Sequence, residues 1–443
     1  MATDPTAVQL ANELADLIRR TGLKTGALVA SEQDLRARHD VGRSVLRQAV
    51  RILEERGLAS MKRGAGGGLI VAPPDPESAG RALAILLESR MQGPNALDRL
   101  LQATDTHVFL TATPRLDLAE CERVRKLALR LRPRTEAGLR RLGEIRQLLT
   151  AIRRLVKDPL AGLAYQATAE YGQDLVPYSV IAGGYDFQRV WWDALLEMIE
   201  AQMAGDVAAL FDLRRRQLAI IQDSQGAWST IDRDSRLVPK IEIEASAETA
   251  QGQSPAERLA RELLRDVRLL GWAPGARIGG AGDLLARYGV TVGTLRQAVR
   301  MLEQNSVVRM ERGRSGGLVV TVPDPEKAID RAVEYLRQTD IAPDDLASFR
   351  RQLRLKALSA ICEAPTTARA KAMEGIAPAD LLNRLGLLSG DGALEVFDSI
   401  VSAIAPAPQA SDDRTIPLIF DALAKGDAAR ARRIFLNHEH AFT

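Results

Sequence analysis

Residues 41–51 read Val-Gly-Arg-Ser-Val-Leu-Arg-Gln-Ala-Val-Arg, and residues 290–300 read Val-Thr-Val-Gly-Thr-Leu-Arg-Gln-Ala-Val-Arg. The offset of 249 between these stretches holds without a gap from residues 10–76 to residues 259–325, where 31 of 67 positions are identical. A match of this length indicates that one small module occurs twice in the chain. Each copy is followed by a longer segment whose apolar spacing is typical of helices.

The first copy predicts three helices followed by a β-hairpin. Glycines at 22 and 26 end the first helix, and Ser31 with Asp34 three residues later resembles a capping box at the start of the second. A glycine-rich run at 64–68 joins two short β stretches, as in a hairpin. This order of elements is that of a winged helix-turn-helix. The expected helices span 8–20, 31–39 and 43–56, and the expected strands span 58–62 and 69–71.

The third helix of this module separates an apolar face from a basic face. Leu46, Ala49, Val50 and Leu53 form one stripe for the core, whereas Arg43, Arg47 and Arg51 lie four residues apart on another face. An α-helix fits the major groove of DNA, where Arg can pair with a guanine edge through two hydrogen bonds. Lys62 and Arg63 enter the hairpin tip, where they can reach phosphates or the minor groove.

These residues resemble the GntR family of bacterial transcription regulators, and the FadR-type subfamily most closely. The resemblance covers both modules, about a third of the chain. It implies an N-terminal winged helix followed by an all-helical domain, called FCD, that binds ligands and dimerises. It also implies that the start of the third helix contacts bases and that the wing contacts the groove. With the basic face above, the expected DNA-binding residues of the first module are Gln33, Gly42, Arg43, Ser44, Val45, Arg47, Arg51, Lys62, Arg63 and Gly64.

The second module departs from the first where bases are expected to be read. Val292 replaces Arg43, Gly293 replaces Ser44 and Gly282 replaces Gln33. Loss of one bidentate Arg contact removes roughly 1–3 kcal/mol of base discrimination. We therefore expect this module to read a different half-site or to hold mostly phosphates, and to be the weaker reader. Its expected DNA-binding residues are Thr291, Thr294, Arg296, Arg300, Arg312, Gly313 and Arg314.

The helical segments resemble FCD domains mainly at a Gly-Asp turn before the last helix, at 205–206 and 426–427. Many FCD domains bind a metal through one Asp and three His, but this chain has only four His. The ligand positions are replaced, with only His438 retained, so the sequence predicts no metal and no other cofactor. The replaced positions fall near Ala164, Leu195, Gln217, Leu382 and Ile416.

Length and composition limit the class of protein. The 443 residues carry 60 Lys and Arg against 57 Asp and Glu, which excludes a strongly basic tail and an acidic disordered chain. Aromatic residues make up only 4%, which disfavours an all-β protein. Cys121 and Cys362 are too few for a disulfide scaffold, and we expect free thiols. No apolar run is long enough to span a membrane and no signal peptide is apparent, so we expect a cytoplasmic protein.

We therefore predict a mainly α fold in which two winged helix-turn-helix domains alternate with two all-helical bundles. The expected domains are 1–76 and 254–325 for the winged helices, and 77–226 and 326–443 for the FCD-like bundles. Residues 227–253 are polar and are expected to be a linker, with 240–244 as a short strand or extended chain. The Pro- and Ala-rich stretch 405–413 is expected to be a loop.

Several other features have a structural interpretation beside a functional one. The run 64–68 lacks the following helix that a phosphate-binding loop needs, so we interpret it as the wing. Tyr185, Phe187, Trp191 and Trp192 are expected to pack in a core, with a ligand-pocket wall as the alternative. His438 and His440 are expected to lie in a frayed tail. The basic stretch 98–157 predicts solvated helix faces, or alternatively an anion pocket or a contact with the DNA backbone.

The predicted function is a sequence-specific DNA-binding transcription regulator, a repressor, built as a tandem duplicate. Its expected partners are double-stranded DNA and a small-molecule effector. Self-association is expected within the chain as a pseudo-dimer, or between chains. We find no catalytic motif and predict no enzyme. The alternatives are an architectural or assembly-forming DNA binder without an effector, and a helical scaffold whose modules no longer bind DNA. The retained Arg43, Arg47 and Arg63 disfavour the scaffold.

Overall fold

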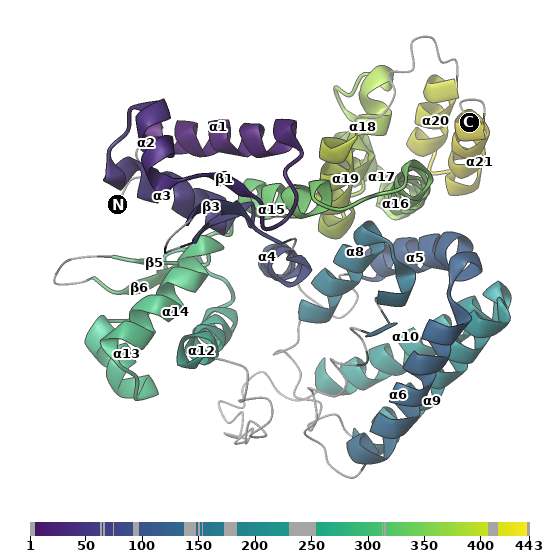
Figure 1. The fold of residues 1–443 in the computed structure, drawn as a ribbon. Coiled ribbons are helices and arrows are strands. Elements are labelled where there is room, and N and C mark those ends of the chain that lie inside the picture. Colours follow the sequence, from purple (N-terminus) through teal and green to yellow (C-terminus); the bar gives the residue numbers. More distant parts are fainter. Residues whose placement is uncertain are drawn as a thin grey trace.

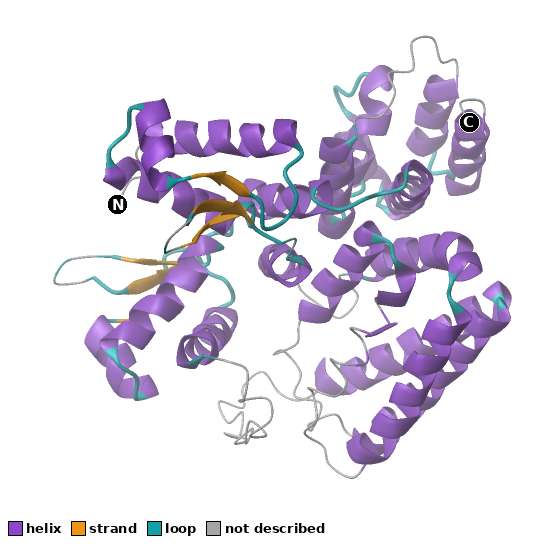
Figure 2. Ribbon diagram, in the orientation of Figure 1, coloured by secondary structure: helices purple, strands orange, loops and turns teal. Residues whose placement is uncertain are grey.

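The protein is mainly helical, with two small antiparallel sheets (Figure 2). Among the described residues, no helix is long and apolar enough to cross a membrane. Below, the first half means residues 5–229 and the second half means residues 254–440. The computed structural model describes residues 5–62, 64, 67–73, 75–91, 97–136, 148, 151–152, 154–171, 184–229, 254–311, 313, 316–405 and 415–440.

The first module has the three expected helices and the expected hairpin, and it adds a third strand. Strand β1 pairs with β3 on the side opposite β2, so the strand order is β1-β3-β2. The elements are α1 (Pro5–Thr21), β1 (Leu28–Ala30), α2 (Glu32–His39), α3 (Arg43–Glu55), β2 (Ala59–Lys62) and β3 (Gly68–Val71).

Local sequence explains how these elements are placed. The Ser31 side chain accepts a hydrogen bond from the Asp34 backbone N–H and so caps α2. The apolar stripe of α3, including Leu46 and Leu53, packs with Leu14 of α1 and Leu69 of β3 in a core made entirely of residues from this module. The opposite face of α3 is thereby left to solvent.

Residues 255–320 fold into the same series of elements with the same sheet topology, β4-β6-β5. The Ser254 side chain and Glu257 form a capping box at the start of the first helix. The elements are α12 (Pro255–Leu269), β4 (Arg277–Gly279), α13 (Ala281–Tyr288), α14 (Val292–Gln304), β5 (Val308–Met310) and β6 (Leu318–Val320).

The helical segment of the first half ends three residues later than expected, because α10 runs to Ser229. Residues 230–253, including 240–244, lie outside the described residues. Trp192 is fully buried beside Leu195 and Ile199, as a core role requires. The elements are α4 (Pro76–Arg90), α5 (Asp98–His107), η1 (Val108–Ala112), η2 (Thr113–Arg115), α6 (Leu118–Glu136), α8 (Pro159–Glu170), α9 (Gly184–Ala204) and α10 (Val207–Ser229).

The helical segment of the second half corrects one expectation. His438 is not in a frayed tail: it is buried in the last helix, and its Nδ1 lies 2.9 Å from Thr415 Oγ1. Residues 406–414 lie outside the described residues. The elements are α15 (Pro325–Arg337), α16 (Pro343–Glu363), α17 (Thr366–Met373), η3 (Pro378–Asp380), α18 (Leu381–Leu388), α19 (Gly392–Ile404), α20 (Thr415–Ala424) and α21 (Ala428–His440).

The helical segments of the two halves share one hydrophobic core. Helix α4 packs against α15, and α5 packs against α16 (Figure 1). Leu83 of α4, Leu100 of α5 and Phe349 of α16 belong to the same buried cluster. Polar pairs border it, such as Arg99 with Glu363 at 2.6 Å. The two halves are therefore joined by a continuous apolar interface as well as by the chain.

The two winged modules dock across the halves. In the first module, Arg19 of α1 reaches Glu334 of α15 at 3.1 Å. In the second, Arg268 of α12 donates from Nε and Nη2 to the two carboxylate oxygens of Glu88 in α4, at 3.0 and 3.1 Å. Ile85 of α4 also joins the core of the second module. Because Arg19 and Arg268 are equivalent in the repeat, each module contacts the first helix of the other half's helical segment through the same position.

Candidate nucleic-acid interface

The start of α3 presents polar side chains and bare backbone to solvent. Gly42 is the N-cap, with extended backbone and no capping side chain. Arg43 follows with its side chain 72% exposed, and its Nε lies 3.9 Å from Glu32 Oε1. The first backbone N–H groups of a helix and its dipole attract anions, so this end of α3 suits DNA phosphates as well as bases.

The residues expected to contact DNA in the first module mostly lie on its surface. Arg47 and Arg51 are exposed on the side of α3 opposite the core, and Gln33 is exposed on α2. Val45 is half-buried and packs against the module core, so its part in binding is limited to its exposed portion. Exposed in addition are Gly42, Ser44, Lys62 and Gly64, whereas Arg63 lies outside the described residues.

In the second module, two residues that were expected to contact DNA stabilise the start of helix α14 instead. The Thr291 Oγ1 caps α14 by accepting from the Thr294 backbone N–H at 3.2 Å, and the two hydroxyl oxygens are 2.9 Å apart. Arg296 and Arg300 are exposed, as their counterparts are in α3. Gly313 is exposed, while Arg312 and Arg314 lie outside the described residues.

The wing of the second module also carries an acidic residue that the sequence analysis did not single out. Glu311 stands at the position of Lys62 and is exposed, with Arg309 Nη2 2.7 Å from its Oε1. The repeat alignment contained this signal, because the offset of 249 pairs the two positions. A carboxylate repels phosphates, so Glu311 is unsuited to the phosphate contact that was expected of Lys62.

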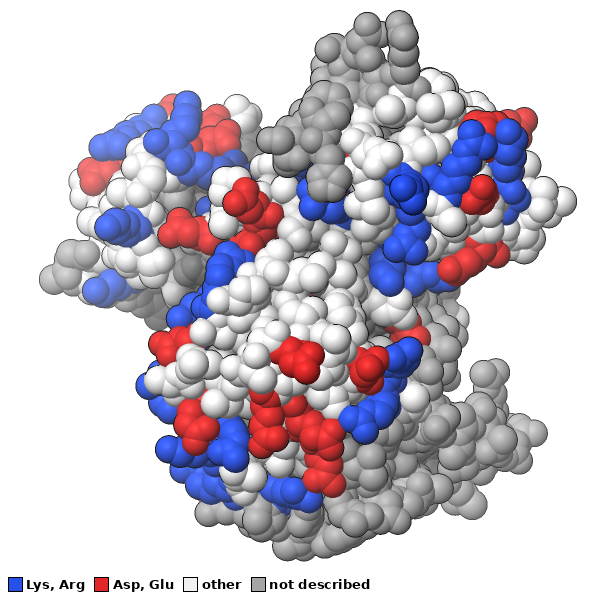
Figure 3. Space-filling view, turned by 90° about the vertical axis from the view of Figure 1, so that its right-hand side faces the viewer, with Lys and Arg blue, Asp and Glu red and all other residues white. Residues whose placement is uncertain are grey.

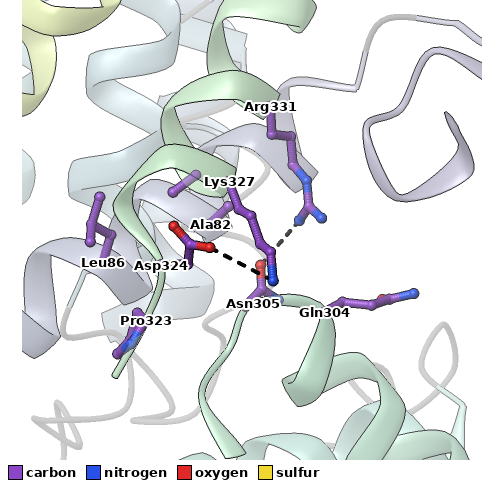
Figure 4. A pocket seen from close by; sticks show the side chains of 9 residues that line it. Ala82, Leu86, Gln304, Asn305, Pro323, Asp324, Lys327 and Arg331 are labelled. Atoms are coloured by element: carbon purple, nitrogen blue, oxygen red, sulfur yellow. Dashed lines mark hydrogen bonds and ion pairs between the residues drawn. The ribbon is translucent and has the colours of Figure 1, made fainter. Parts of the chain in front are cut away.

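A small pocket marks the joint between the second module and the helical segments. The end of α14 meets α4 and the start of α15 there (Figure 4). Arg331 donates to Asn305 at 3.0 Å, and Lys327 lies 3.8 Å from Asp324. The Arg331 contact, together with a hydrogen bond from Lys327 Nζ to Ser306 Oγ at 3.2 Å, holds the C-terminal end of α14 against the start of α15.

One buried cluster among the described residues combines groups that can ligate a metal: His107, Asp158 and Asp345. His107 Nε2 donates to Asp158 at 2.5 Å, and Asp345 is paired with Arg115 at 2.6 Å. The other oxygen of Asp158 caps α8. Each group thus has a protein partner, and the cluster joins α5 and α8 to α16. None of the three is a position that the FCD resemblance assigned to a metal.

Burial alone would raise the pKa of the Asp158 carboxyl. The hydrogen bond and charge of His107, with two backbone N–H groups of α8, outweigh that effect and hold this pKa below its usual value. The carboxylate therefore stays charged inside the protein. By its contacts, this cluster is a structural link between the two halves.

The basic stretch of the first half is residues 98–157. In its described part, basic side chains form ion pairs on helix faces. Arg125 of α6 lies 3.4 Å from Glu200, and Arg132 lies 2.7 Å from Asp193 of α9. On the face drawn in Figure 3, Lys and Arg side chains lie beside Asp and Glu side chains in mixed groups. These observations favour solvated helix faces over a second DNA surface in this segment.

Comparison with known proteins identifies the first module. Residues 6–68 match the family described as "Bacterial regulatory proteins, gntR family", and this stretch includes α1 from its second residue and all of α2 and α3. No curated protein shows a significant match. A solved structure, Streptococcus agalactiae GntR, is 18% identical over 51% of this chain and 100% of that chain, with a TM-score of 0.28. A TM-score this low carries no argument about the fold. The family match places a gntR-type helix-turn-helix domain at residues 6–68.

Proposed function

We propose that this chain is a sequence-specific DNA-binding transcription regulator that acts as a repressor in the cytoplasm. The observation that carries the proposal is the start of α3 inside a gntR-family domain. There Arg43, Arg47 and Arg51 face solvent while the stripe through Leu46 is buried. An exposed Arg row on a helix whose other face is fixed in a core is suited to the major groove. The gntR family consists of regulators, so an enzymatic activity is not part of the proposal.

The proposal includes a tandem duplication of a FadR-type regulator. The gapless repeat, the equal sheet topologies and the equivalent Arg19 and Arg268 contacts support it. Each helical segment also has a Gly-Asp turn before its last helix, where Asp206 and Asp427 accept hydrogen bonds from the backbone of that helix. One chain then presents two DNA-reading modules, as a dimer of an ordinary regulator does.

A small-molecule effector in the second half is the regulatory part of the proposal. Arg354 of α16 is only 5% exposed, and among the described residues its Nε and Nη2 have no hydrogen-bond partner, nor has Oδ1 of the buried Asp398. Burial lowers the pKa of Arg354 and raises the pKa of Asp398, so both charges are held at a cost. A small polar molecule that bonds both groups would offset this cost.

The test of DNA binding is a selection from random DNA with the purified full chain. Wild type is compared with Arg43→Ala and Arg47→Ala, and with Arg123→Ala as a matched control. The Arg123 side chain is 69% exposed on α6, far in sequence from the module. We expect one enriched motif that the control retains and that both α3 variants lose. Enrichment that persists in both variants would refute the role of α3.

An architectural DNA binder without an effector is the second candidate, and the first half favours it. Inside that half Tyr165 donates to Asp105 at 2.6 Å and Arg214 donates to the same carboxylate at 2.8 Å, so these buried groups need no ligand. This candidate predicts binding that enriches no sequence and weakens steeply with salt.

A further inference from the structure

The two modules differ most at the surface formed by the starts of their second and third helices. The first module places Glu32 and Gln33 on α2, and Arg43 and Ser44 on α3. At the equivalent positions the second module places two glycines and two small apolar residues, all exposed: Ala281, Gly282, Val292 and Gly293. We call these four residues the apolar reading edge. It has no side chain that can donate or accept a hydrogen bond.

The fold of the second module does not require its two glycines. Neither Gly282 nor Gly293 has a positive φ. A Cβ at Gly282 would meet no atom within 4 Å, and one at Gly293 would meet only Thr291 Oγ1, at the ordinary contact distance of 3.7 Å. Glycine weakens a helix relative to alanine, so a structural role does not explain it here. What the glycines do provide is bare backbone at the surface, over which another molecule can approach closely.

Val292 is an exposed apolar residue at the position that Arg43 occupies in the first module. It is 56% exposed and belongs to no hydrophobic core of the described residues, unlike Leu295 one turn later. Ala281 replaces Glu32, the partner of Arg43, so both members of that ion pair are absent together. In the major groove the apolar feature of a base edge is the C5-methyl group of thymine.

We propose that the second module recognises a thymine methyl group through Val292, and that one chain therefore binds an operator with two unlike half-sites. Gly282 and Gly293 allow α13 and α14 to approach the base edges closely enough for this contact. Arg296 and Arg300 hold the phosphates alongside. The inference rests on the proposed DNA-binding function and assigns the base that its second module takes.

The test replaces thymine by deoxyuridine, which lacks only the methyl group, at each thymine of the selected operator. Affinity is measured for the full-length wild type, Val292→Ala and Arg43→Ala. We expect two unlike half-sites. In one of them deoxyuridine weakens wild-type binding about fourfold, the factor for one buried methyl group. Val292→Ala should lose this sensitivity, whereas Arg43→Ala should retain it and lose discrimination in the other half-site.

A palindromic operator with equal deoxyuridine sensitivity in both half-sites overturns the inference, as does full sensitivity in Val292→Ala. Gly293→Ala tests the close approach: binding should weaken without loss of thermal stability, and unchanged binding contradicts the close approach. If no sequence is enriched and Arg47→Ala has no effect, the proposed function itself fails. That outcome is distinct from a symmetric operator read by both modules.

Discussion

Leu46 and Arg47 are neighbours in the chain, but one side chain is buried and the other is exposed. Leu46 is 1% exposed in the module core, and Arg47 faces solvent on the same helix. The pair recurs as Leu295 and Arg296. Because the helix turns by about 100° per residue, adjacent positions fall on different faces. Under the proposed function, stability and DNA binding thus rest on separate side chains.

Single substitutions at these two positions should separate the two properties. Leu46→Ala leaves a cavity in the core and should destabilise the module by about 2–5 kcal/mol. Arg47→Ala should leave the stability within about 0.5 kcal/mol of wild type and weaken operator binding. Thermal unfolding and an affinity measurement on both variants check this. A strongly destabilised Arg47→Ala would contradict the assignment.

Asp158 makes the buried cluster with His107 sensitive to acid. Its pKa is lowered in the folded protein, so its contribution to stability is fully present above the unfolded value near 4 and is lost as the pH falls through the folded value. Asp158→Asn keeps the cap of α8 but lacks this titration. We expect its Tm to be below that of wild type at pH 6, with the gap closing below pH 4. A gap that widens on acidification would show the opposite sign.

At the scale of elements, the cross-half docking includes two ion pairs, made by equivalent arginines in different surroundings. Arg268 and Glu88 are 9% and 4% exposed, whereas Arg19 is 34% exposed beside a Glu334 that is 7% exposed. Removing one partner of a buried pair leaves an uncompensated charge, whereas an exposed partner is screened by water.

Arg268→Ala should therefore cost about 3–5 kcal/mol, and Arg19→Ala should cost less, because water that already reaches Arg19 can solvate Glu334 once the Arg19 side chain is removed. Denaturant unfolding of the full chain measures both, and Arg265→Ala, exposed on the same helix as Arg268, serves as control. Equal losses for Arg19 and Arg268 would show that burial does not set the strength of these joints.

Most helices and strands of the two modules could be predicted from the sequence. The three helices and the hairpin of each module follow from periodicity and from caps such as Ser31. Strand β1 was missed because three residues carry no periodic signal. The central place of α4 had a usable signal: residues 82–87 are apolar without interruption, which predicts a helix buried on every side. The contacts of Arg19 and Arg268 had none, since a single sequence does not pair residues that are hundreds of positions apart.

For the candidate DNA surface, spacing alone predicted the exposed faces of α3 and α14. It did not predict that Thr291 is used as a cap, because Thr serves equally at a cap and at a DNA contact. His438 was placed in a frayed tail because it is near the terminus, but packing against Thr415 of α20 holds it inside. Tertiary contacts decided both cases.

At the scale of the whole molecule, the two modules differ in how far they depend on the rest. The core of the first module contains only its own residues, whereas that of the second includes Ile85 of α4. A fragment of residues 5–73 should therefore fold alone, and a fragment of residues 254–322 should be less stable. Circular dichroism melts of the two fragments check this. A second fragment at least as stable as the first would contradict the role of Ile85.

The shared core predicts that the halves stay together without the connecting chain. A protease site introduced between residues 230 and 253 should be cut without separating the products, because α4 and α5 remain packed on α15 and α16. Size-exclusion chromatography should show one species near the uncut mass of 48.2 kDa. The same site placed at a chain end is the control. Two separated fragments would mean that the interface depends on the connection.

Docking across the halves has a genetic consequence. In a homodimer, one gene encodes both reading helices, so a mutation changes both operator contacts at once. Here the two proposed reading helices, α3 and α14, are encoded separately, yet the module that carries each of them contacts a helix of the opposite half through Arg19 or Arg268. Under the proposed function, a mutation at Val292 or Arg43 therefore alters one operator contact and leaves the other module, and the helices that position it, unchanged. Mutation of this gene can therefore change the recognition of one half-site while the recognition of the other is kept.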